Sequence, residues 1–378
     1  MALAHQIDII VQDAIERRVF PGVVVLVARD GDIRHFAAYG STMYEALGSR
    51  PIARDTIYDI ASLTKMFTAT AALRLIDAGR LDIDAPVAAY LPELRAPGIA
   101  VIHLLTHTSG LDIRLSSLRE AGRAGVLAAV YAAAPIRPPG EAVAYTNVNS
   151  LLLGEIVERL CGEPLDQALH ALVIEPLGLR DTRFCPPAAL RPRIAPTEID
   201  EGWRGGLVHG SVHDESTHAL GGVAGHAGLF STAADLYIFC RMWFDDERRM
   251  TDKEARRQED KEITYADCSP LHPFTPSPLH PFTPSLLRRE TIALACSNHT
   301  AQASAACGLG WMIDRPNFMG HAPVGTFGHT GFTGPALVLV PQERLIVVVL
   351  SNRIYPRRRP PPFEHHAVTA AIVNAALA

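Results

Sequence analysis

The chain has 378 residues, of which 48% are hydrophobic and 20% are charged, and its formal net charge at neutral pH is -5. At about 100 to 200 residues per domain, this length suggests two packed units. The composition is typical of a soluble globular protein and argues against a disordered chain. No basic face is evident and the net charge is negative, so we expect no nucleic-acid partner.

The N-terminal residues are expected to form an amphipathic helix. Leu3, Ile7, Val11 and Ala14 recur at helical spacing, with charged residues between them. The sequence lacks the basic and apolar stretches of a secretory leader, and no window reaches the ~18 apolar residues of a membrane span. Six scattered cysteines favour free thiols in a reducing compartment. We therefore predict a cytoplasmic protein without a membrane span, or a periplasmic or secreted one if a leader has been removed.

Strands are predicted near both ends of the chain, with helices between them. Residues 22–29 and 33–39 flank a turn at 30–32, and residues 335–340 and 345–350 flank a turn at 341–344, so each pair predicts a β-hairpin. Helical patterns cover residues 63–78, 102–105, 117–134, 151–161 and 367–377. We predict an α/β domain formed by residues 1–60 together with 290–378, and a mostly helical domain formed by residues 61–289.

The predicted helical domain contains a duplicated segment. Charges alternate in sign over residues 245–262, and the octapeptide SPLHPFTP at 269–276 is repeated at 277–284. Proline every few residues removes backbone donors and blocks helix formation. We predict a mobile Pro-rich insertion at about 245–289, and we favour a tolerated loop expansion over a docking segment for a partner.

Ser62 and Lys65 are the first candidates for chemistry. Helical positions three apart share a face, so the Lys65 amine can lie within hydrogen-bond reach of the Ser62 hydroxyl. A desolvated, neutral lysine could accept the serine proton, whereas an arginine would stay protonated. The alternative is a helix-capping serine beside a solvated lysine, because S-x-x-K alone is a weak pattern.

Residues 145–147 could supply further groups to such a serine. Tyr145 has a phenol that can relay a proton, and Asn147 has an amide donor and acceptor for a substrate. A packed tyrosine and a helix-capping asparagine are the alternative. The segment 104–110, LLTHTSG, is expected to be a structural turn that closes a helix beside the site.

Residues 328–332 lead into the terminal strands and could bind a substrate. His329 offers a polar or cationic head for a carboxylate, Thr330 offers a hydroxyl, and Gly331 permits close backbone approach. The backbone N–H groups of Ser62 and Phe332 could together form an oxyanion hole. The alternative is a histidine in a turn.

The three motifs resemble those of the serine β-lactamase and penicillin-binding superfamily, in particular its class C-like branch, which also holds DD-peptidases, D-aminopeptidases and esterases. That family has S-x-x-K, Y-x-N and, in many members, K-T-G, in this order. The corresponding residues here, spread over nearly the whole chain, are Ser62-x-x-Lys65, Tyr145-x-Asn147 and His329-Thr330-Gly331. Three motifs in order make the resemblance specific.

The resemblance implies an α+β fold of the β-lactamase/transpeptidase type, with an antiparallel sheet flanked by the terminal helices, a mostly helical domain, and the active site between them. It implies that Ser62 forms an acyl-enzyme on an amide or ester bond, and that Lys65 and Tyr145 handle its proton. Asn147 and the strand at 329–331 would hold the substrate. Which of Lys65 and Tyr145 is the general base stays open. No cofactor is implied, and the expected partner is a small-molecule or short peptide substrate.

One departure from the family bears on the substrate. His329 replaces the lysine that is most typical of class C β-lactamases, and histidine is only partly charged near neutral pH. Binding of a β-lactam carboxylate is therefore expected to be weaker. A D-amino-acid peptidase or a broad esterase fits at least as well as an antibiotic hydrolase.

Two other functions remain as alternatives. Histidines and carboxylates between His209 and His226 could suggest a metal site, but they lack a spacing such as H-E-x-x-H, and we favour a glycine-rich loop lining the cleft of Ser62 without a metal. A penicillin-recognising sensor or scaffold would be acylated once without turnover, whereas an enzyme would release product repeatedly. We predict the enzyme.

Overall fold

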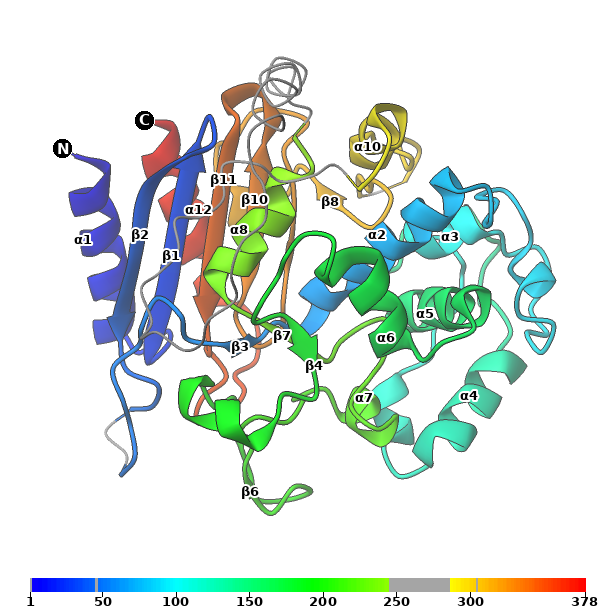
Figure 1. Cartoon of the computed structure of the whole chain (residues 1–378), viewed down its shortest axis with the longest axis horizontal. Coiled ribbons are helices and arrows are strands. Elements are labelled where there is room, and N and C mark those ends of the chain that lie inside the picture. Colours follow the sequence, from blue (N-terminus) through cyan, green and yellow to red (C-terminus); the bar gives the residue numbers. More distant parts are fainter. Residues whose placement is uncertain (1, 45–46, 245–285, 304) are drawn as a thin grey trace, which may run out of the picture.

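The computed structural model describes residues 2–44, 47–244, 286–303 and 305–378. A six-stranded antiparallel sheet and a group of helices lie side by side in it, and both chain ends lie on the sheet side (Figure 1). The SPLHPFTP duplication lies outside the described residues, as does the predicted Pro-rich insertion from 245 to 285.

Strands from both ends of the chain form the large sheet. The two predicted hairpins are confirmed as β1 with β2 and β10 with β11, and β1 pairs with β11 so that Val25 lies opposite Val349. The sheet order is β2 (Asp32–Gly40), β1 (Gly22–Arg29), β11 (Leu345–Ser351), β10 (Ala336–Val340), β9 (Phe327–Thr330) and β8 (Met312–Ile313).

The apolar run in β1 is explained by burial on both faces of the sheet. Successive side chains of a strand point to opposite faces. Val23, Val25 and Val27 belong to the core beneath the terminal helices, whereas Val24 and Leu26 belong to the core shared with the helical part. Because both faces of β1 are buried, its sequence is apolar throughout and does not alternate between apolar and polar residues.

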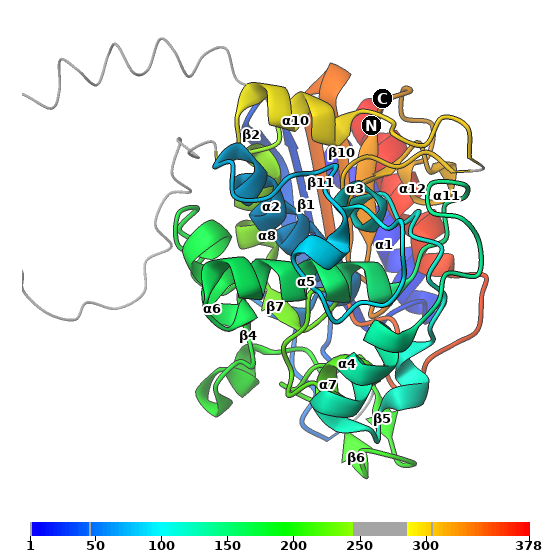
Figure 2. The same ribbon diagram turned by 90° about the vertical axis from the view of Figure 1, so that its right-hand side faces the viewer.

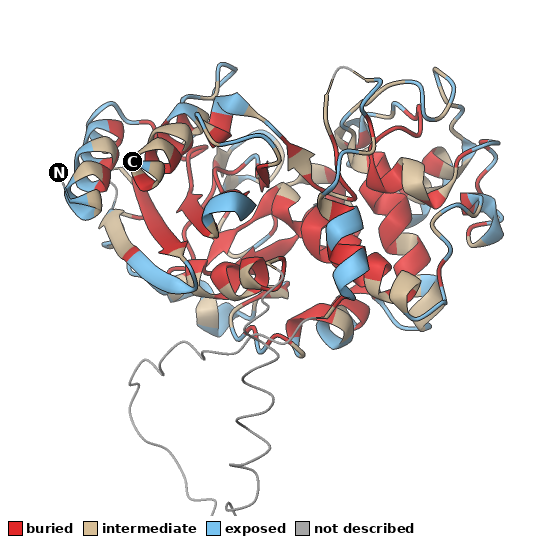
Figure 3. Ribbon diagram, turned by 90° about the horizontal axis from the view of Figure 1, so that it is seen from above, coloured by how far each residue is buried: buried red, intermediate tan, exposed pale blue. Residues whose placement is uncertain are grey.

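The terminal helices α1 (Leu3–Glu16) and α12 (Glu364–Leu377) pack against each other on one face of the sheet. The predicted apolar positions of α1 are confirmed, because Ile7, Val11 and Ala14 are buried. Figure 3 shows the buried strands beside these helices, whose outer faces are exposed. This arrangement confirms the flanked antiparallel sheet that the resemblance implies.

The helical side packs against the other face of the sheet around α2, in which eleven of fourteen residues are buried (Figure 2). Its core is continuous with that of the sheet, and α8, within residues 61–289, packs against β1 and β11. The division into two domains stays a prediction. The helices are α2 (Thr64–Asp77), α3 (Val101–Leu105), α4 (Gly122–Ala132), α5 (Asn147–Cys161), α6 (Leu165–Leu169) and α8 (Ala233–Arg241).

Three helices differ from the sequence prediction by three residues or more, and one of them is α12, which begins at Glu364 rather than at 367. The helix predicted over residues 117–134 is a 3-10 turn, Leu115–Leu118, followed by the shorter α4, and Gly122 at the break has a φ of 63°. Glycine adopts this left-handed region readily, which explains the interruption. The helix predicted over residues 151–161 begins earlier, at Asn147, because Thr146 has the extended backbone of an N-cap.

Short elements complete the described chain. No helix in the described ranges is long and apolar enough to cross a membrane. The five described cysteines are free thiols, as predicted, and Cys268 lies outside the described residues. The remaining elements are β3 (Tyr58–Asp59), β7 (Leu229–Ser231) and β4 (Arg183–Phe184) in one small sheet, β5 (Ile199–Asp200) with β6 (Gly206–Leu207) in another, and the helices α7 (Glu215–Ala219), α10 (Arg289–Cys296) and α11 (Pro316–Met319).

Candidate active site

Ser62 lies in a one-turn 3-10 helix, Ala61–Leu63, between β3 and α2. The preceding Ala61 has a φ of 45°, in the left-handed region that disfavours a side chain. The buried Asp59 holds this turn, because its Oδ1 accepts a hydrogen bond from the Ala61 N–H at 2.8 Å and its Oδ2 accepts one from the His213 N–H at 2.7 Å. Burial raises the pKa of Asp59. The Ser62 turn is thus fixed from two sides.

Lys65 is buried beneath Ser62, with 2% of its surface exposed. Its Nζ donates to Ser62 Oγ at 2.9 Å, to Asn147 Oδ1 at 3.0 Å and to the His226 carbonyl oxygen at 3.1 Å. Of these three oxygens, the amide and carbonyl oxygens only accept hydrogen bonds, whereas a hydroxyl can also donate. The amine in its neutral form can therefore keep two donated bonds and receive the Ser62 proton.

Asn147, the first residue of α5, connects Lys65 to a carboxylate. Its Oδ1 accepts from Lys65, and its Nδ2 lies 3.5 Å from Asp214 Oδ2, at the long limit of a hydrogen bond. Burial alone would raise the pKa of Asp214. Hydrogen bonds from His226, Ser216 and the Thr217 N–H outweigh it and hold that pKa well below its usual range. Asp214 therefore carries a carboxylate, which orients the side-chain amide of Asn147.

The segment between His209 and His226 supports this site through hydrogen bonds. His226 is buried, its Nε2 lies 3.0 Å from the hydroxyls of Ser216 and Thr217, and its carbonyl oxygen accepts from Lys65. No group of three or more His, Cys, Asp or Glu side chains within the described ranges could hold a metal ion. The segment thus contacts Lys65 through the His226 carbonyl, and none of its residues is among those that line the pocket at Ser62, so the expected glycine-rich lining of the cleft stays a prediction.

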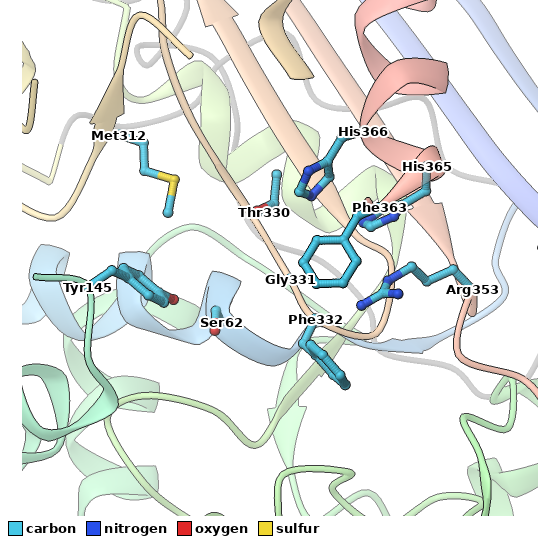
Figure 4. A pocket seen from close by; sticks show the side chains of 10 residues that line it. All are labelled: Ser62, Tyr145, Met312, Thr330, Gly331, Phe332, Arg353, Phe363, His365 and His366. Atoms are coloured by element: carbon cyan, nitrogen blue, oxygen red, sulfur yellow. The ribbon is translucent and has the colours of Figure 1, made fainter. Parts of the chain in front are cut away.

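The Tyr145 ring lies between two histidine rings. Its centroid is 4.8 Å from that of His107 and 5.7 Å from that of His329, and the Lys65 Nζ lies 4.9 Å from it. Figure 4 shows the phenol pointing toward Ser62. The hydroxyl has no hydrogen-bond partner among the described residues, and the side chain is partly exposed to solvent. The phenol is therefore free to bond a substrate or a reacting proton.

His329, on β9, is neutral rather than cationic. It is 1% exposed, and burial, with a smaller contribution from Lys65, lowers its pKa to about 3. Its Nδ1 lies 2.8 Å from the Thr330 carbonyl oxygen, which fixes the proton on Nδ1. Of the two options that the sequence left open, a polar or a cationic head, the buried ring fits the polar one. His329 can offer only an unprotonated Nε2.

His107 was not singled out for the site from the sequence. It lies in the predicted turn at 104–110 with a φ of 56°, and its Nδ1 accepts a hydrogen bond from Asn149 Nδ2 at 3.2 Å. Burial and the nearby Lys65 lower its pKa to about 3. His107 is thus a second neutral imidazole against Tyr145, and no local spacing in the sequence distinguishes it from a turn residue.

The end of β9 lies against the Ser62 turn. A β-carbon added to Gly331 would lie 2.7 Å from the Ile60 carbonyl oxygen, so this position requires glycine. Thr330 and Phe332, on either side of it, line the same pocket as Ser62. The Phe332 N–H donates to no backbone carbonyl within the described ranges. Gly331 therefore packs against the backbone just before Ser62, and Thr330 and Phe332 share the pocket with Ser62.

A pocket of about 150 Å³ opens at Ser62 (Figure 4). This volume is small for a ligand site, since pockets for drug-sized ligands measure about 300 to 1,000 Å³. Half of the lining comes from residues that the sequence analysis did not identify. The lining residues are Ser62, Tyr145, Met312, Thr330, Gly331, Phe332, Arg353, Phe363, His365 and His366.

Known proteins share this fold over almost the whole chain. EstCE1, a hydrolase with promiscuous acyltransferase activity, superposes with a TM-score of 0.70 at 23% identity, covering 98% of both chains. A class C beta-lactamase mutant gives a TM-score of 0.69 at 19% identity, covering 98% of this chain and 96% of its own. These likenesses confirm the predicted β-lactamase/transpeptidase-like fold.

The sequence comparisons identify the family. A protein of Escherichia coli (strain K12) that is named as a D-alanyl-D-alanine carboxypeptidase is 29% identical over 391 aligned positions, which cover 91% of this chain and 82% of its own. The family model described as Beta-lactamase matches residues 7–371. Because that match spans nearly all of the sequence, the chain belongs to the Beta-lactamase family.

Proposed function

We propose that this chain is a serine hydrolase that forms a covalent acyl-enzyme on Ser62 and cleaves amide or ester bonds of small substrates. The observation that carries the proposal is the 2.9 Å contact between Lys65 Nζ and Ser62 Oγ, with the two other bonds of the amine made to oxygens that cannot donate. A positioned base one hydrogen bond from a hydroxyl is the requirement for an activated serine.

In the acylation step, Ser62 Oγ attacks the substrate carbonyl carbon while its proton passes to the neutral Lys65 amine. The carbonyl oxygen becomes an oxyanion, for which the N–H groups of Ser62 and Phe332 are the proposed donors. Collapse of this intermediate breaks the bond to the leaving amine or alcohol, which takes up the proton that Lys65 received, so the Lys65 amine is neutral again. Water then hydrolyses the ester on Ser62 by the same steps in reverse.

Tyr145 is the second candidate for proton transfer. Its hydroxyl points toward Ser62 and has no other described partner, so it can pass a proton to the leaving group or serve as the base together with Lys65 (Figure 4). Both neighbouring histidines are neutral at working pH, so no imidazolium competes with this role. Asn147 would hold the substrate in addition to orienting Lys65.

Small peptides ending in D-amino acids, or small esters, are the substrates that the pocket favours. Its volume is about 150 Å³, and its third-motif histidine is neutral, which removes the cation that a β-lactam carboxylate would meet there. The relative that is named as a carboxypeptidase supports a peptide substrate. Rapid hydrolysis of antibiotics is therefore not expected.

The test is turnover of three substrates by the purified protein: a short-chain nitrophenyl ester, a D-Ala-D-Ala peptide and a chromogenic cephalosporin. Ser62→Ala should abolish every activity, whereas the exposed Ser117→Ala should change none. Mass spectrometry should find the acyl group on Ser62. Repeated product release supports the enzyme, and a single adduct without release supports a sensor. Loss of activity to a chelator, or activity retained in Ser62→Ala, would contradict the proposal.

A further inference from the structure

His213 contacts both sides of the proposed oxyanion hole. Its backbone N–H donates to Asp59 Oδ2 at 2.7 Å, and the other oxygen of that carboxylate binds the Ala61 N–H, one residue before Ser62. Its imidazole lies against the Phe332 ring, with 5.7 Å between the ring centroids and 24° between the ring planes. The side chain is buried. One residue of the segment before α7 thus touches the turn of Ser62 and the side chain of Phe332.

The peptide group that carries the Phe332 N–H has few restraints of its own. It follows Gly331, and glycine has the least restricted backbone of all residues. The turn after Gly331 is closed by a hydrogen bond from the Gly334 N–H to the Gly331 carbonyl oxygen at 3.0 Å. Thr333 is anchored separately, because its hydroxyl donates to the Asp59 carbonyl oxygen at 2.7 Å. Neither bond involves Phe332 itself, so we expect the packing of its ring to fix the preceding peptide group.

Other neighbours of the Phe332 ring come from the C-terminal segment. The guanidinium carbons of Arg353 and Arg358 lie 4.8 Å and 5.9 Å from its centroid, and the Phe363 ring meets it edge-on, with 6.4 Å between the centroids. The Phe332 ring is nevertheless 40% exposed. Compared with these neighbours, His213 differs in presenting a nearly parallel ring and in being bonded to the carboxylate that holds the Ser62 turn.

A buried ion pair holds the His213 ring in place. Its Nε2 lies 2.7 Å from Glu198 Oε2, and Glu198 in turn accepts two bonds from Arg358, from Nε at 3.0 Å and from Nη2 at 2.7 Å. Burial alone would raise the pKa of Glu198, but the hydrogen bonds from His213 and Arg358 outweigh it and lower that pKa to about 2. A carboxylate facing Nε2 places a proton on that nitrogen. Because charge-assisted bonds are short and strong, the ring cannot turn away from Phe332 without losing one.

We propose that His213 is a positioning residue for the oxyanion hole, and that the Glu198–Arg358 pair fixes its ring for this task. The inference rests on the proposed function, in which the N–H groups of Ser62 and Phe332 bind the oxyanion. Such donors must lie about 2.7 to 3.1 Å from the developing charge, so both have to be aimed together. Ser62 and Phe332 line the pocket (Figure 4), whereas His213 lies outside its lining and acts through them without touching the substrate.

Ring variants test the proposal, since the backbone bond to Asp59 survives a substitution of the side chain. His213→Ala removes the contact with Phe332 and should lower kcat on the nitrophenyl ester by about ten-fold or more, part of the roughly 10² to 10³ that an oxyanion-hole donor contributes, while KM stays within about two-fold. His213→Phe keeps a flat ring and should restore most of kcat. Glu198→Gln removes the anion and should give an intermediate kcat. His218→Ala, at an exposed position of α7, should match the wild type.

A boronic acid measures the oxyanion hole without turnover. Phenylboronic acid adds through its boron to a serine hydroxyl, and an oxygen of the resulting tetrahedral adduct occupies the oxyanion position, so its affinity follows transition-state binding. Its inhibition constant should rise in His213→Ala by the same factor as kcat falls, and it should stay near the wild-type value in His213→Phe. A residue that only stabilises the fold would lower the melting temperature without this parallel change.

These measurements separate the inference from the proposed function. If the wild type shows no turnover that depends on Ser62, the proposed enzyme fails, and the affinity for phenylboronic acid still decides the inference. If phenylboronic acid binds the wild type no better than Ser62→Ala, both fail. Unchanged kcat and affinity in a folded His213→Ala would overturn the inference alone. Should His213→Ala not fold, Glu198→Gln decides by the same two measurements, because it keeps the ring of His213.

Discussion

Gly154 and Gly225 bring two backbones into direct contact beside the buried lysine. A β-carbon on Gly225 would lie 3.1 Å from the Gly154 Cα and 2.1 Å from the Ser150 carbonyl oxygen. The Gly225 carbonyl oxygen accepts a hydrogen bond from Thr68 on α2 at 2.9 Å, and the next carbonyl, that of His226, accepts from Lys65. The close approach of α5 to the loop at Gly225 therefore positions the His226 carbonyl oxygen, which accepts a hydrogen bond from Lys65.

Gly225→Ala is expected to lower both stability and activity. The added methyl group must push the loop away from α5, at a cost of about 1 to 3 kcal/mol in the free energy of unfolding. The displaced His226 carbonyl would weaken one bond to Lys65, so kcat should fall. Urea unfolding and ester hydrolysis measure the two effects. Gly202→Ala is the control, since its nearest atom would lie 3.8 Å away. Equal changes in the free energy of unfolding and in kcat for Gly225→Ala and Gly202→Ala would contradict the steric argument.

Lys65→Arg should eliminate nearly all hydrolysis. Arginine keeps a positive charge but cannot become neutral at working pH, so it cannot accept the Ser62 proton. Loss of a general base typically costs about 10² to 10⁴ in rate. The measurement is kcat on the nitrophenyl ester together with the amount of acyl-enzyme by mass spectrometry.

Lys65→Met serves as the second variant, because the larger guanidinium could disturb packing at a site that is 2% exposed. It removes the amine without adding bulk, and both variants should be equally inactive. An arginine variant that retained more than about a tenth of wild-type kcat would exclude Lys65 as the base.

Tyr145→Phe should change the rate but hardly change the stability. The phenol is 45% exposed and its hydroxyl bonds no described residue, so the free energy of unfolding should move by less than about 0.5 kcal/mol. If the phenol transfers a proton in the reaction, kcat should fall by about 10² to 10⁴. Rapid-mixing kinetics separate acylation from deacylation and so assign the step. A variant with wild-type kcat would leave Lys65 as the proposed base.

Stability is expected to fall as the pH drops from about 6.5 toward 3. Burial lowers the pKa of His107 and of His329 to about 3 from the ordinary 6.5, so between these values the unfolded chain binds more protons than the folded one. The free energy of unfolding must then decrease on acidification, by up to about 1.4 kcal/mol per pH unit for each histidine.

His107→Asn tests this assignment, because asparagine tolerates the left-handed φ of 56° at this position. In this variant, the free energy of unfolding should change less steeply with pH between about 6.5 and 3, because one of the two histidines no longer contributes. Chemical unfolding at several pH values provides the slope. His5→Asn, an exposed position on α1, should leave the slope as in the wild type. A slope that is unchanged in His107→Asn would show that His107 titrates normally.

The features predicted from the sequence are those that depend on local spacing. Turn residues 30–32 and 341–344 define the hairpins, and the three-residue spacing of Ser62 and Lys65 places their side chains on one face. Such patterns need no knowledge of the rest of the fold. The motifs at 145–147 and 329–331 lie far from Ser62 in the sequence, so they were assigned to the same site from the family resemblance and not from local spacing.

The features that were not predicted depend on contacts between distant segments. Arg353 enters the pocket because β11 lies beside β1 and ends near Ser62, and its lack of a partner can be seen only in three dimensions. The charge state of His329 follows from complete burial, which a four-residue strand motif does not reveal. His107 becomes part of the site only because Tyr145 packs on it.

Asp59 joins three segments that are far apart in the chain. Its carboxylate binds the turn before Ser62 and the N–H of His213, and its backbone carbonyl accepts a hydrogen bond from Thr333, 274 positions later. We therefore expect Ser62, the proposed nucleophile, to reach its final geometry only after the C-terminal strands have docked. In a refolding experiment, ester hydrolysis should therefore recover later than circular dichroism, and a truncated or nascent chain would be protected from premature, unselective acylation of its own serine.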